Sequence, residues 1–289
     1  MSPYNAPKKN LHREFLYLDR DTIANSLSAL EAGMIDEIIQ KANESREGGF
    51  GAGLRAGPAE LSAAKKRASE VEEELVIKRT TFSVFQAWHE RLIEASAFGT
   101  FDEWNLGVSE ELNVGDTLEF TATLRLAPLH MLIRTYLAYA NDASNQDSPM
   151  AQHGAELKET KRLARQISVM AGLREGDPDK IPVYLAPFGI EEPRMLASLD
   201  DRYLVRSKED IEGTFRVIAQ VDQMLDEGGE IPISRFFSGV PPTPLEVKVT
   251  GEAWGHMIEP AKELGVEISG DDIMVPYPAV SVRPIAIWR

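Results

Sequence analysis

The sequence predicts an α+β fold, with a mostly antiparallel sheet and helices packed on one side of it. Apolar residues at helical spacing dominate the N-terminal half, whereas short alternating segments typical of strands cluster after Lys180. Strands and helices do not alternate regularly along the chain, so a doubly wound parallel sheet is not expected. We therefore expect a helix-rich N-terminal half and a strand-rich C-terminal third.

The expected domain organisation rests on one polar segment, Asn141–Pro149, which reads NDASNQDSP and is rich in turn-forming residues. It predicts an N-terminal α+β subdomain over residues 11–140, a linker over residues 141–153 and a C-terminal α+β subdomain over residues 154–289. A chain of 289 residues is long enough for two such units.

The first expected elements are a buried strand, Phe15–Leu18, and an amphipathic helix directly after it. Asp19 or Asp21 can cap this helix, because a carboxylate accepts hydrogen bonds from the free N–H groups of the first turn. Gly33 suits a left-handed end of the helix. Its apolar face carries Ile23, Leu27, Leu30 and Met34.

Three more helices and a strand are expected before residue 172. Thr81–Ala95 has an apolar stripe, and residues 117–126 alternate as a strand entered through a turn at Gly115–Asp116. Pro128 suits the first turn of the next helix, and Ala155–Ala171 predicts another. We interpret the basic patch of this last helix as an exposed face; its members are Lys158, Lys161, Arg162 and Arg165.

The C-terminal third is expected to be rich in strands. Three segments have strand patterns: Ile181–Ala186, Gly213–Leu225 and Ile231–Ile233. Arg194–Asp201 indicates a brief helix that leads into Arg202–Val205. Leu245–Val249 indicates a further strand, and a helix is expected near Glu252–Leu264.

The last segment, Asp271–Arg289, reads as a strand that contains a proline. Pro284 cannot donate to a sheet ladder, so the strand must bulge or lie at an edge there. By simple alternation, one face carries Val280 and Val282, and the other carries Ile285 and Ile287.

Glu47–Pro58 has the most unusual composition in the chain, EGGFGAGLRAGP. Its glycine spacing matches neither the dinucleotide-binding fingerprint nor the P-loop, and a connector is the favoured interpretation. The alternatives are that Phe50 and Arg55 bind a ligand or partner, or that the segment acts on a membrane. A thin glycine-rich strand and a net charge of −15 oppose insertion into a bilayer, so no membrane binding is expected.

The acidic composition limits the kinds of partner. The chain has 46 acidic and 31 basic residues, and this surplus of negative charge repels a phosphate backbone. We therefore expect a protein partner or a small ligand and no nucleic acid. The sequence contains no cysteine, which excludes disulfides and thiolate catalysis. The chain starts without a signal peptide and lacks an apolar run of ~20 residues, so a cytoplasmic protein is expected.

Several short segments spread along the chain resemble one known family. They are FLYLD at residues 15–19, the helix Phe82–Leu92, the strand after Gly115–Asp116, GTFRVIAQV at residues 213–221 and the ending PAVSVRPIAIWR. With these segments the chain resembles the bacterial domain-of-unknown-function family 6414, although Trp288 stands where a tyrosine is expected. The resemblance implies a bacterial cytoplasmic protein and implies no activity.

The motifs do not indicate a reaction. The five histidines include no pair at the spacing of a helical metal site, and a Gly-x-Ser-x-Gly nucleophile elbow is absent. Neighbouring residues of a strand point to opposite faces, so a carboxylate doublet by itself does not form a metal site. The doublets are Asp36–Glu37, Glu191–Glu192, Asp200–Asp201 and Asp271–Asp272. We expect no metal and no cofactor.

The leading hypothesis is a non-enzymatic binding or regulatory protein of the bacterial cytoplasm, within a stress or phage-defence assembly. One alternative is a metal-dependent hydrolase of nucleotides or phosphodiesters, in which Asp19, Asp36 and Asp201 assemble as catalytic carboxylates. The second alternative is a membrane-active protein that uses the Gly-rich segment.

Overall fold

The structure is a computed structural model that describes residues 13–31, 81–171, 173, 179–238, 244–263 and 265–289. Contacts divide the chain into two compact units, Met1–Leu18 with Gly99–Arg289, and Asp19–Phe98. This division differs from the boundary expected at residues 141–153, because that segment connects two helices that pack against each other within the first unit.

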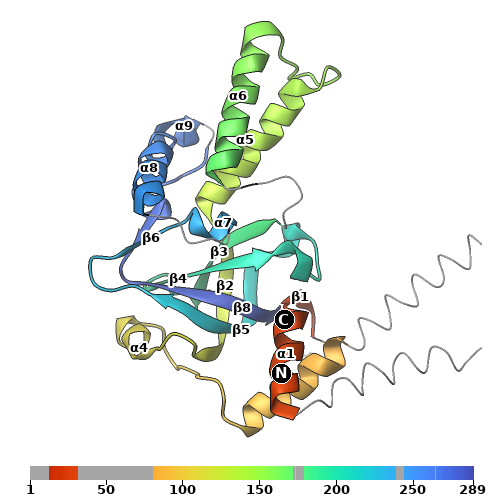
Figure 1. The fold of residues 1–289 in the computed structure, drawn as a ribbon, viewed down its shortest axis with the longest axis vertical. Helices are drawn as coiled ribbons and strands as arrows, with labels where there is room; N and C mark the ends of the chain where they lie inside the picture. The colour runs from red at the N-terminus through yellow and green to blue at the C-terminus, as the bar shows by residue number, and fades with distance from the viewer. Residues whose placement is uncertain (1–12, 32–80, 172, 174–178, 239–243, 264) are drawn as a thin grey trace, which may run out of the picture. The chain divides into compact units, whose positions relative to one another are not determined.

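Five strands of the first unit close into a barrel (Figure 1). They are β2 (Thr117–Leu126), β3 (Lys180–Pro187), β4 (Arg194–Asp200), β5 (Gly213–Met224) and β8 (Ala279–Trp288). Their order around the barrel is β8, β4, β3, β2 and β5, and β5 pairs back with β8. Neighbouring strands are antiparallel except β4 and β8, which run parallel.

The α+β class is confirmed, but the arrangement expected within it is partly wrong. The pairing is not antiparallel throughout, and the sheet curls on itself instead of lying flat beneath a layer of helices. The physical reason is that closing a sheet buries the apolar faces of its strands against one another and leaves few unpaired edges.

Alternate residues of each strand fill the barrel interior, as the period-two patterns of residues 117–126 and 213–225 predict. The buried inward residues are Leu118, Phe120, Ala122 and Leu124 of β2, Ile181, Val183 and Leu185 of β3, Met195, Ala197 and Leu199 of β4, and Phe215, Val217, Ala219 and Val221 of β5. The intervening side chains of β2, β3 and β4 therefore point to the outer surface of the barrel.

β8 contains a β-bulge beside Pro284, which confirms that the proline interrupts regular pairing. Ile218 of β5 pairs with Ala286, and the next residue, Ala219, pairs with Pro284. Ile285 is consequently an extra residue on β8 at this point.

The bulge changes which side chains at the end of β8 point into the barrel. An extra residue reverses the alternation of a strand, so inward and outward positions exchange beyond it. Ile287 therefore joins Val280 and Val282 in the barrel interior. The expectation that Ile287 lies on the face opposite Val280 and Val282 was wrong for this reason.

The expected first strand is confirmed as β1 (Phe15–Leu18), and all four of its residues are buried. It pairs antiparallel with the end of β8, with Phe15 opposite Trp288 and Leu18 opposite Ala286. On its other side, Val205 donates its backbone N–H to the carbonyl of Leu16 at 2.9 Å. β1 thus covers the part of β8 that extends beyond β4.

Helices occupy the two long connections of the barrel (Figure 1). Between β2 and β3 lie α5 (Pro128–Ser144) and α6 (Gly154–Met170), at the positions the sequence predicts. Between β5 and β8 lie β6 (Glu230–Pro232), α7 (Arg235–Ser238), α8 (Pro244–Gly255), α9 (Ile258–Glu263), the 3₁₀ turn η3 (Gly270–Asp272) and β7 (Met274–Pro276). Among the described residues, no helix is both long enough and apolar enough to cross a membrane.

These two connections share a second hydrophobic core outside the barrel. Its buried members include Leu129, Leu132, Ile133, Ile167, Leu196, Ile231, Phe236, Phe237, Trp254, Ile268 and Val275. The core holds α5, α6 and the β5–β8 connection against the outward side of β4, where Leu196 lies.

Two secondary-structure expectations in the C-terminal third were wrong. Arg194–Asp201 was expected to be a helix, but residues 194–200 form β4, whose apolar run is buried on both faces and so lacks strand alternation. Leu245–Val249 was expected to be a strand, but it lies inside the helix α8. Local β-propensity is a weak guide there, because tertiary packing overrides it.

The second unit contains α1 (Arg20–Glu31) and a helix over residues 81–94. Asp19 caps α1, as predicted: its carboxylate accepts the backbone N–H of Thr22 at 3.0 Å and the hydroxyl of Thr22 at 2.7 Å. Ile23 and Leu27 are buried on one face of α1. The expected helix end at Gly33 and the face position of Met34 lie outside the described residues.

Remaining short elements complete the first unit. They are α4 (Leu106–Glu111), η1 (Asp201–Tyr203) and η2 (Lys208–Asp210). The start of α4 is capped by Asn105, whose side chain accepts the backbone N–H of Val108 at 3.1 Å. Arg202 and Tyr203 belong to η1.

Asp200, at the end of β4, is 3% exposed and accepts four hydrogen bonds. Lys180 donates at 2.6 Å, the guanidinium of Arg202 donates at 2.7 and 3.0 Å, and the backbone N–H of Arg202 donates at 3.1 Å. Burial by itself raises the pKa of Asp200, but the bonds from Arg202 and Lys180 outweigh it and hold the pKa well below the ordinary 3.8. Asp200 therefore ties the start of β3 to the end of β4.

Replacing Asp200 with Asn is expected to destabilise the protein by about 2 kcal/mol near pH 7. The amide has no negative charge to pair with Lys180 and Arg202, and it offers a donor NH2 group where one of the carboxylate oxygens accepted hydrogen bonds. The loss is measured by denaturant unfolding. Asp201→Asn is the matched control, since Asp201 makes a single 3.6 Å ion pair with the exposed Lys208. Because the pKa of Asp200 is lowered, its contribution exists above pH 3.8 and disappears as the pH falls below that value. Equal stability of the two variants would contradict this assignment.

His130 of α5 is buried in the second core, with its ring stacked on Phe237 at 5.7 Å between centroids. Its Nδ1 atom is buried and has no hydrogen-bond partner among the described residues. Burial, with smaller contributions from Arg134 and Lys208, lowers the pKa of His130 from 6.5 to about 4. The folded protein therefore holds this imidazole neutral.

Stability is expected to fall as the pH drops from 6.5 towards 4, because the unfolded chain takes up a proton on His130 that the folded chain does not. The loss approaches about 3 kcal/mol at the lower end of this window and is absent above it. His130→Phe keeps a ring against Phe237 and should reduce the pH dependence. His153→Phe, at an exposed position, serves as the control. Unfolding free energies of both variants across this pH range test the assignment, and parallel curves would refute it.

Candidate functional site

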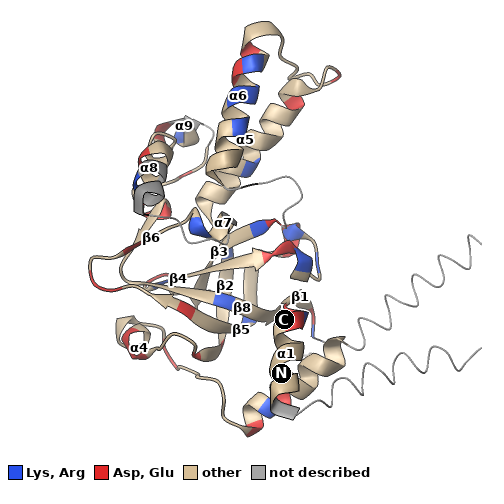
Figure 2. Ribbon diagram, viewed as in Figure 1, with Lys and Arg blue, Asp and Glu red and all other residues tan. Residues whose placement is uncertain are grey.

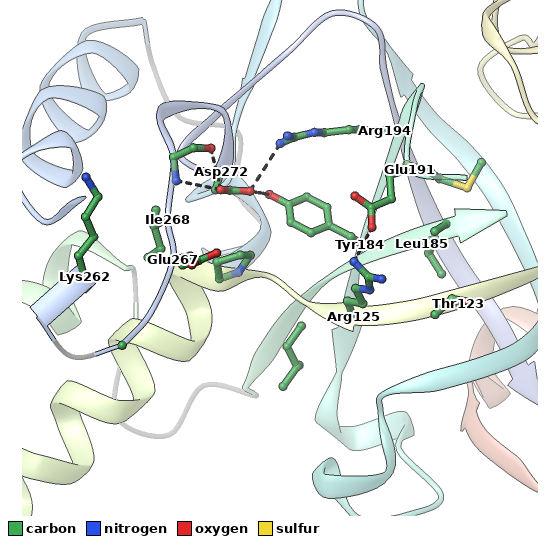
Figure 3. A pocket seen from close by; sticks show the side chains of 16 residues that line it. Thr123, Arg125, Tyr184, Leu185, Glu191, Arg194, Lys262, Glu267, Ile268 and Asp272 are labelled. Carbon is green, nitrogen blue, oxygen red and sulfur yellow. Dashed lines mark hydrogen bonds and ion pairs between the residues drawn. The ribbon is translucent and has the colours of Figure 1, made fainter. Parts of the chain in front are cut away.

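A pocket of about 800 Å³ lies on the outer side of the barrel (Figure 3). Its floor consists of outward residues of β2 and β3, and the start of β4 borders it. The beginning of α5, together with Lys262 and residues 265–272 of the β5–β8 connection, forms its walls. Both long connections of the barrel therefore contribute to the same pocket.

Tyr184 occupies the centre of the floor because of the strand register. It pairs with Arg125 on β2 and with Leu196 on β4, so the outward side chains of three strands form one row. The guanidinium of Arg194 lies over the Tyr184 ring, 5.8 Å from its centroid, as expected for a cation–π contact.

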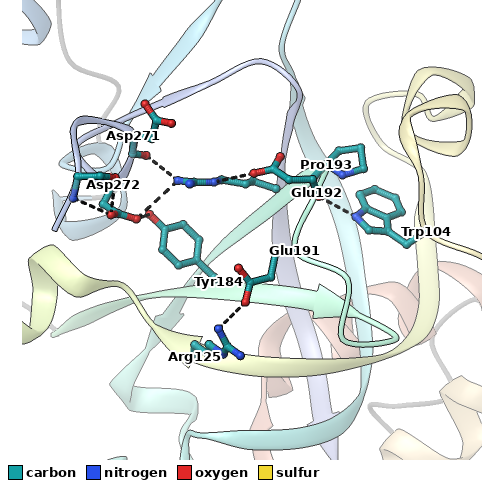
Figure 4. Close-up of polar contacts among 10 residues, drawn as sticks. Trp104, Arg125, Tyr184, Glu191, Glu192, Pro193, Asp271 and Asp272 are labelled. Carbon is teal, nitrogen blue, oxygen red and sulfur yellow. Dashed lines mark hydrogen bonds and ion pairs between the residues drawn. The ribbon is translucent and has the colours of Figure 1, made fainter. Parts of the chain in front are cut away.

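Arg194 connects three segments of the chain, and Figure 4 shows its partners Glu192, Asp271 and Asp272. Its Nε donates to Glu192 at 3.1 Å, and one terminal nitrogen donates to the backbone carbonyl of Asp271 at 2.8 Å. The same nitrogen lies 3.6 Å from the carboxylate of Asp272. The guanidinium therefore joins the β3–β4 loop, β4 and η3, and has several partners within the protein.

Asp272 is held from two sides. Its carboxylate accepts the backbone N–H of Ser269 at 2.9 Å and the hydroxyl of Ser269 at 2.8 Å, which closes the turn of η3. The hydroxyl of Tyr184 lies 3.5 Å from the other carboxylate oxygen. Burial, and then the negative charge of Asp272, raise the pKa of Tyr184, so its phenol stays protonated.

At the mouth of the pocket, Arg125 forms an ion pair with Glu191 of the β3–β4 loop. Both side chains are more than 60% exposed, at 63% and 62%. Exposed pairs contribute little to stability, so a ligand can displace this contact at low cost. On the opposite wall, Glu267 is exposed and makes no hydrogen bond or ion pair with any described residue.

The β3–β4 loop is anchored to the interior of the unit. Trp104, which is 1% exposed, donates its indole N–H to the carbonyl of Pro193 at 2.7 Å (Figure 4). Phe188 packs edge-on against Phe101, and its backbone N–H donates to Thr121 at 3.2 Å. The loop that presents Glu191 and Glu192 is therefore held in place before any ligand binds.

The ionic side chains that line the pocket balance. Arg125, Arg194 and Lys262 are cationic, and Glu191, Glu267 and Asp272 are anionic, so three charges of each sign give a sum of zero. Apolar side chains of Leu126, Pro128 and Ile268 lie among them. Over the part of the chain that the structure describes, no group of three His, Asp or Glu residues has metal-binding geometry. The pocket can thus bind a molecule with both polar and apolar groups.

The residues proposed from the sequence lie elsewhere. Asp19 caps α1 in the second unit, and Asp201 lies in η1 of the first unit, 3.6 Å from Lys208. Asp36, Phe50 and Arg55 are outside the described residues. The basic patch of α6 forms an exposed face, visible as the blue positions along that helix in Figure 2.

Sequence reasoning missed Arg125, Tyr184 and Arg194, which line the pocket. Two of the carboxylate doublets noted in the sequence, Glu191–Glu192 and Asp271–Asp272, partly indicated the position of the pocket. Residues of both doublets contact Arg125 or Arg194 through a side chain or a backbone carbonyl. A doublet alone was not expected to form a metal site. In the structure Glu191 pairs with Arg125 and Asp272 with Arg194, both far away in sequence, whereas Glu192 pairs with Arg194 two residues further along the chain.

The connectivity of the barrel defines the structural class. Numbered along the chain, its five strands are arranged in the order 1-2-3-5-4-1, with the third and fifth parallel. This is the connectivity of the OB barrel, a five-stranded Greek-key barrel. The described residues therefore form a barrel of OB-type connectivity with helical insertions. The floor of the pocket lies on its first and second strands, and the third strand borders the pocket.

Within this class, the chain belongs to the family described as Domain of unknown function (DUF6414), whose model matches residues 12–288. The resemblance noted in the sequence is thereby confirmed. No curated protein and no solved structure matches the chain.

Asp272→Ala is expected to release η3 from the sheet, because Ser269, Tyr184 and Arg194 all lose a contact with its carboxylate. We expect a destabilisation of about 1–2 kcal/mol and faster hydrogen exchange at residues 267–273. Asp271→Ala is the matched control, since Arg194 contacts the backbone carbonyl of Asp271 and not its side chain. Equal exchange rates in the two variants would show that the Asp272 carboxylate does not hold this segment.

Proposed function

We propose that this protein is a non-enzymatic binding module that holds a small polar ligand in the pocket above Tyr184. The observation that carries the proposal is the pocket itself, which has a volume of about 800 Å³ and combines an aromatic floor, apolar walls and charged groups at its mouth. This volume lies within the range of small-molecule sites, which bury apolar surface and use a few polar groups for orientation.

The position of the pocket supports the proposal by analogy. OB barrels bind oligonucleotides and oligosaccharides on the face of their second and third strands, between the loops that follow the first and fourth strands. Here the second strand is β3, which carries Tyr184, and the third is β4, whose start borders the pocket. The β2–β3 and β5–β8 connections correspond to the two loops. A shared fold does not establish a shared function, so the analogy supports the location and not the identity of the ligand.

The charges of the pocket favour a small ligand over a nucleic acid. Nucleic-acid sites owe most of their affinity to unpaired Lys and Arg that neutralise phosphates. Arg194 instead contacts Glu192, Asp271 and Asp272, and Glu267 adds a free negative charge. A phosphate backbone entering the pocket would therefore meet carboxylates.

A regulatory role within a bacterial stress or phage-defence assembly stays a prediction, as do the cytoplasmic location and a protein partner. The hydrolase alternative has no supporting observation in the described residues, where Asp19 and Asp201 make local contacts with Thr22 and Lys208. Turnover of nucleotides with a divalent metal, abolished by Asp19→Asn, would favour this alternative over the binding module.

Native mass spectrometry of the purified protein tests the proposal. We expect a bound small molecule whose occupancy falls about tenfold in Arg125→Ala, because a charge-assisted contact at the pocket mouth is lost. Arg283→Ala is the matched control, since Arg283 is also an exposed arginine on the outside of the barrel but does not line the pocket. Equal occupancy in the two variants would place the ligand elsewhere and refute the proposal.

A further inference from the structure

We propose that the ligand of this pocket is a zwitterion, namely a free amino acid or a short peptide with an apolar side chain. This inference rests on the proposed function and adds the chemical class of the ligand. It depends on which charged groups of the pocket already form several contacts within the protein, and which remain accessible to a ligand.

Arg194 and Asp272 belong to the framework of the pocket. Arg194 is shared among Glu192, the carbonyl of Asp271 and Asp272, and Asp272 also accepts two hydrogen bonds from Ser269. A ligand that competed for either group would have to break several contacts at once. Arg194 and Asp272 therefore stabilise the structure of the pocket, and other charged residues bind the ligand.

Arg125 and Glu267 are accessible charges. Arg125 has one ion-pair partner, Glu191, and the pair is exposed to solvent. Glu267 has no partner among the described residues. Lys262 pairs with Glu259 at 2.7 Å, and because this pair is also exposed, Lys262 is a further accessible cation. In the view of Figure 3, Glu267 and Arg125 lie to either side of Tyr184, so these two residues offer an anion and a cation on opposite sides of the pocket.

This pattern selects against ligands with charge of one sign. A polyphosphate would be repelled by Glu191, Glu267 and Asp272, and a polyamine would be repelled by Arg125 and Arg194. A zwitterion satisfies accessible groups of both signs, with its carboxylate at Arg125 and its ammonium at Glu267.

The apolar lining indicates which kind of side chain the ligand carries. Leu126, Pro128 and Ile268 border the pocket, and burying apolar surface against them favours a ligand with an aliphatic side chain. The volume of about 800 Å³ leaves room for more than one residue, so a short peptide fits the site as well as a free amino acid.

Calorimetry with defined probes tests the inference. The probes are the dipeptide Leu-Ala, free leucine, N-acetyl-Leu-Ala, Leu-Ala-amide, AMP and spermidine. We expect Leu-Ala or leucine to bind, each singly blocked dipeptide to bind about tenfold more weakly, and AMP and spermidine not to bind. Stronger binding of Leu-Ala than of leucine would identify the ligand as a peptide, and the reverse would identify a free amino acid.

Variants of Arg125 and Glu267 assign each end of the ligand. Glu267→Gln should weaken Leu-Ala about tenfold and leave N-acetyl-Leu-Ala unchanged, because the blocked peptide has no ammonium to lose. Arg125→Gln should weaken Leu-Ala and leave Leu-Ala-amide unchanged. Both positions are exposed, so both variants should fold, and Glu230→Gln, also exposed but outside the pocket, is the control.

Three outcomes would overturn the inference: equal binding of free and blocked dipeptides, tighter binding of AMP or spermidine, or no binding of any zwitterion at millimolar concentration. If AMP or spermidine binds and Arg125→Ala abolishes that binding, the pocket is a ligand site and only the zwitterion assignment fails. If a co-purified ligand remains bound in Arg125→Ala, the proposed function itself fails.

Discussion

The closure of the barrel through β8 is the constraint on which the rest of the structure depends. β8 pairs with β5 along one side, and on its other side it pairs first with β4 and then with β1. The bulge at Ile285 lets the strand bend between these partners and keep Ile287 in the interior. Without this closure, the outward side chains of β2, β3 and β4 would not face the β5–β8 connection, and the pocket between them would not form.

The pocket depends in turn on Arg194, which contacts β3, the β3–β4 loop and η3. Its contacts with Glu192, Asp271 and Asp272 bring the β3–β4 loop and η3 to the same place on the sheet. Partial burial strengthens such charge-assisted contacts, and it also makes their loss costly. The pocket walls are therefore held by ionic contacts above an apolar core.

The charge of the whole chain and the charge of the pocket differ. The chain carries a net charge of −15, whereas the ionic side chains of the pocket sum to zero. An acidic surface repels polyanions from the protein as a whole. Within the pocket, charges of both signs favour a ligand that also carries both signs. Membership of a family of unknown function adds no ligand, so the local chemistry carries the proposal.

The sequence by itself determined the features that local periodicity or the stereochemistry of one residue encodes. These are the α+β class, the strands β1, β2 and β5, the helices α5 and α6, the cap at Asp19 and the irregular strand pairing at Pro284. Barrel closure, the strand β4 and the helix α8 needed the tertiary structure, since burial on both faces erases alternation and packing overrides propensity. The pocket was likewise decided by the fold, because strand register places Arg125 beside Tyr184, 59 residues further along the chain.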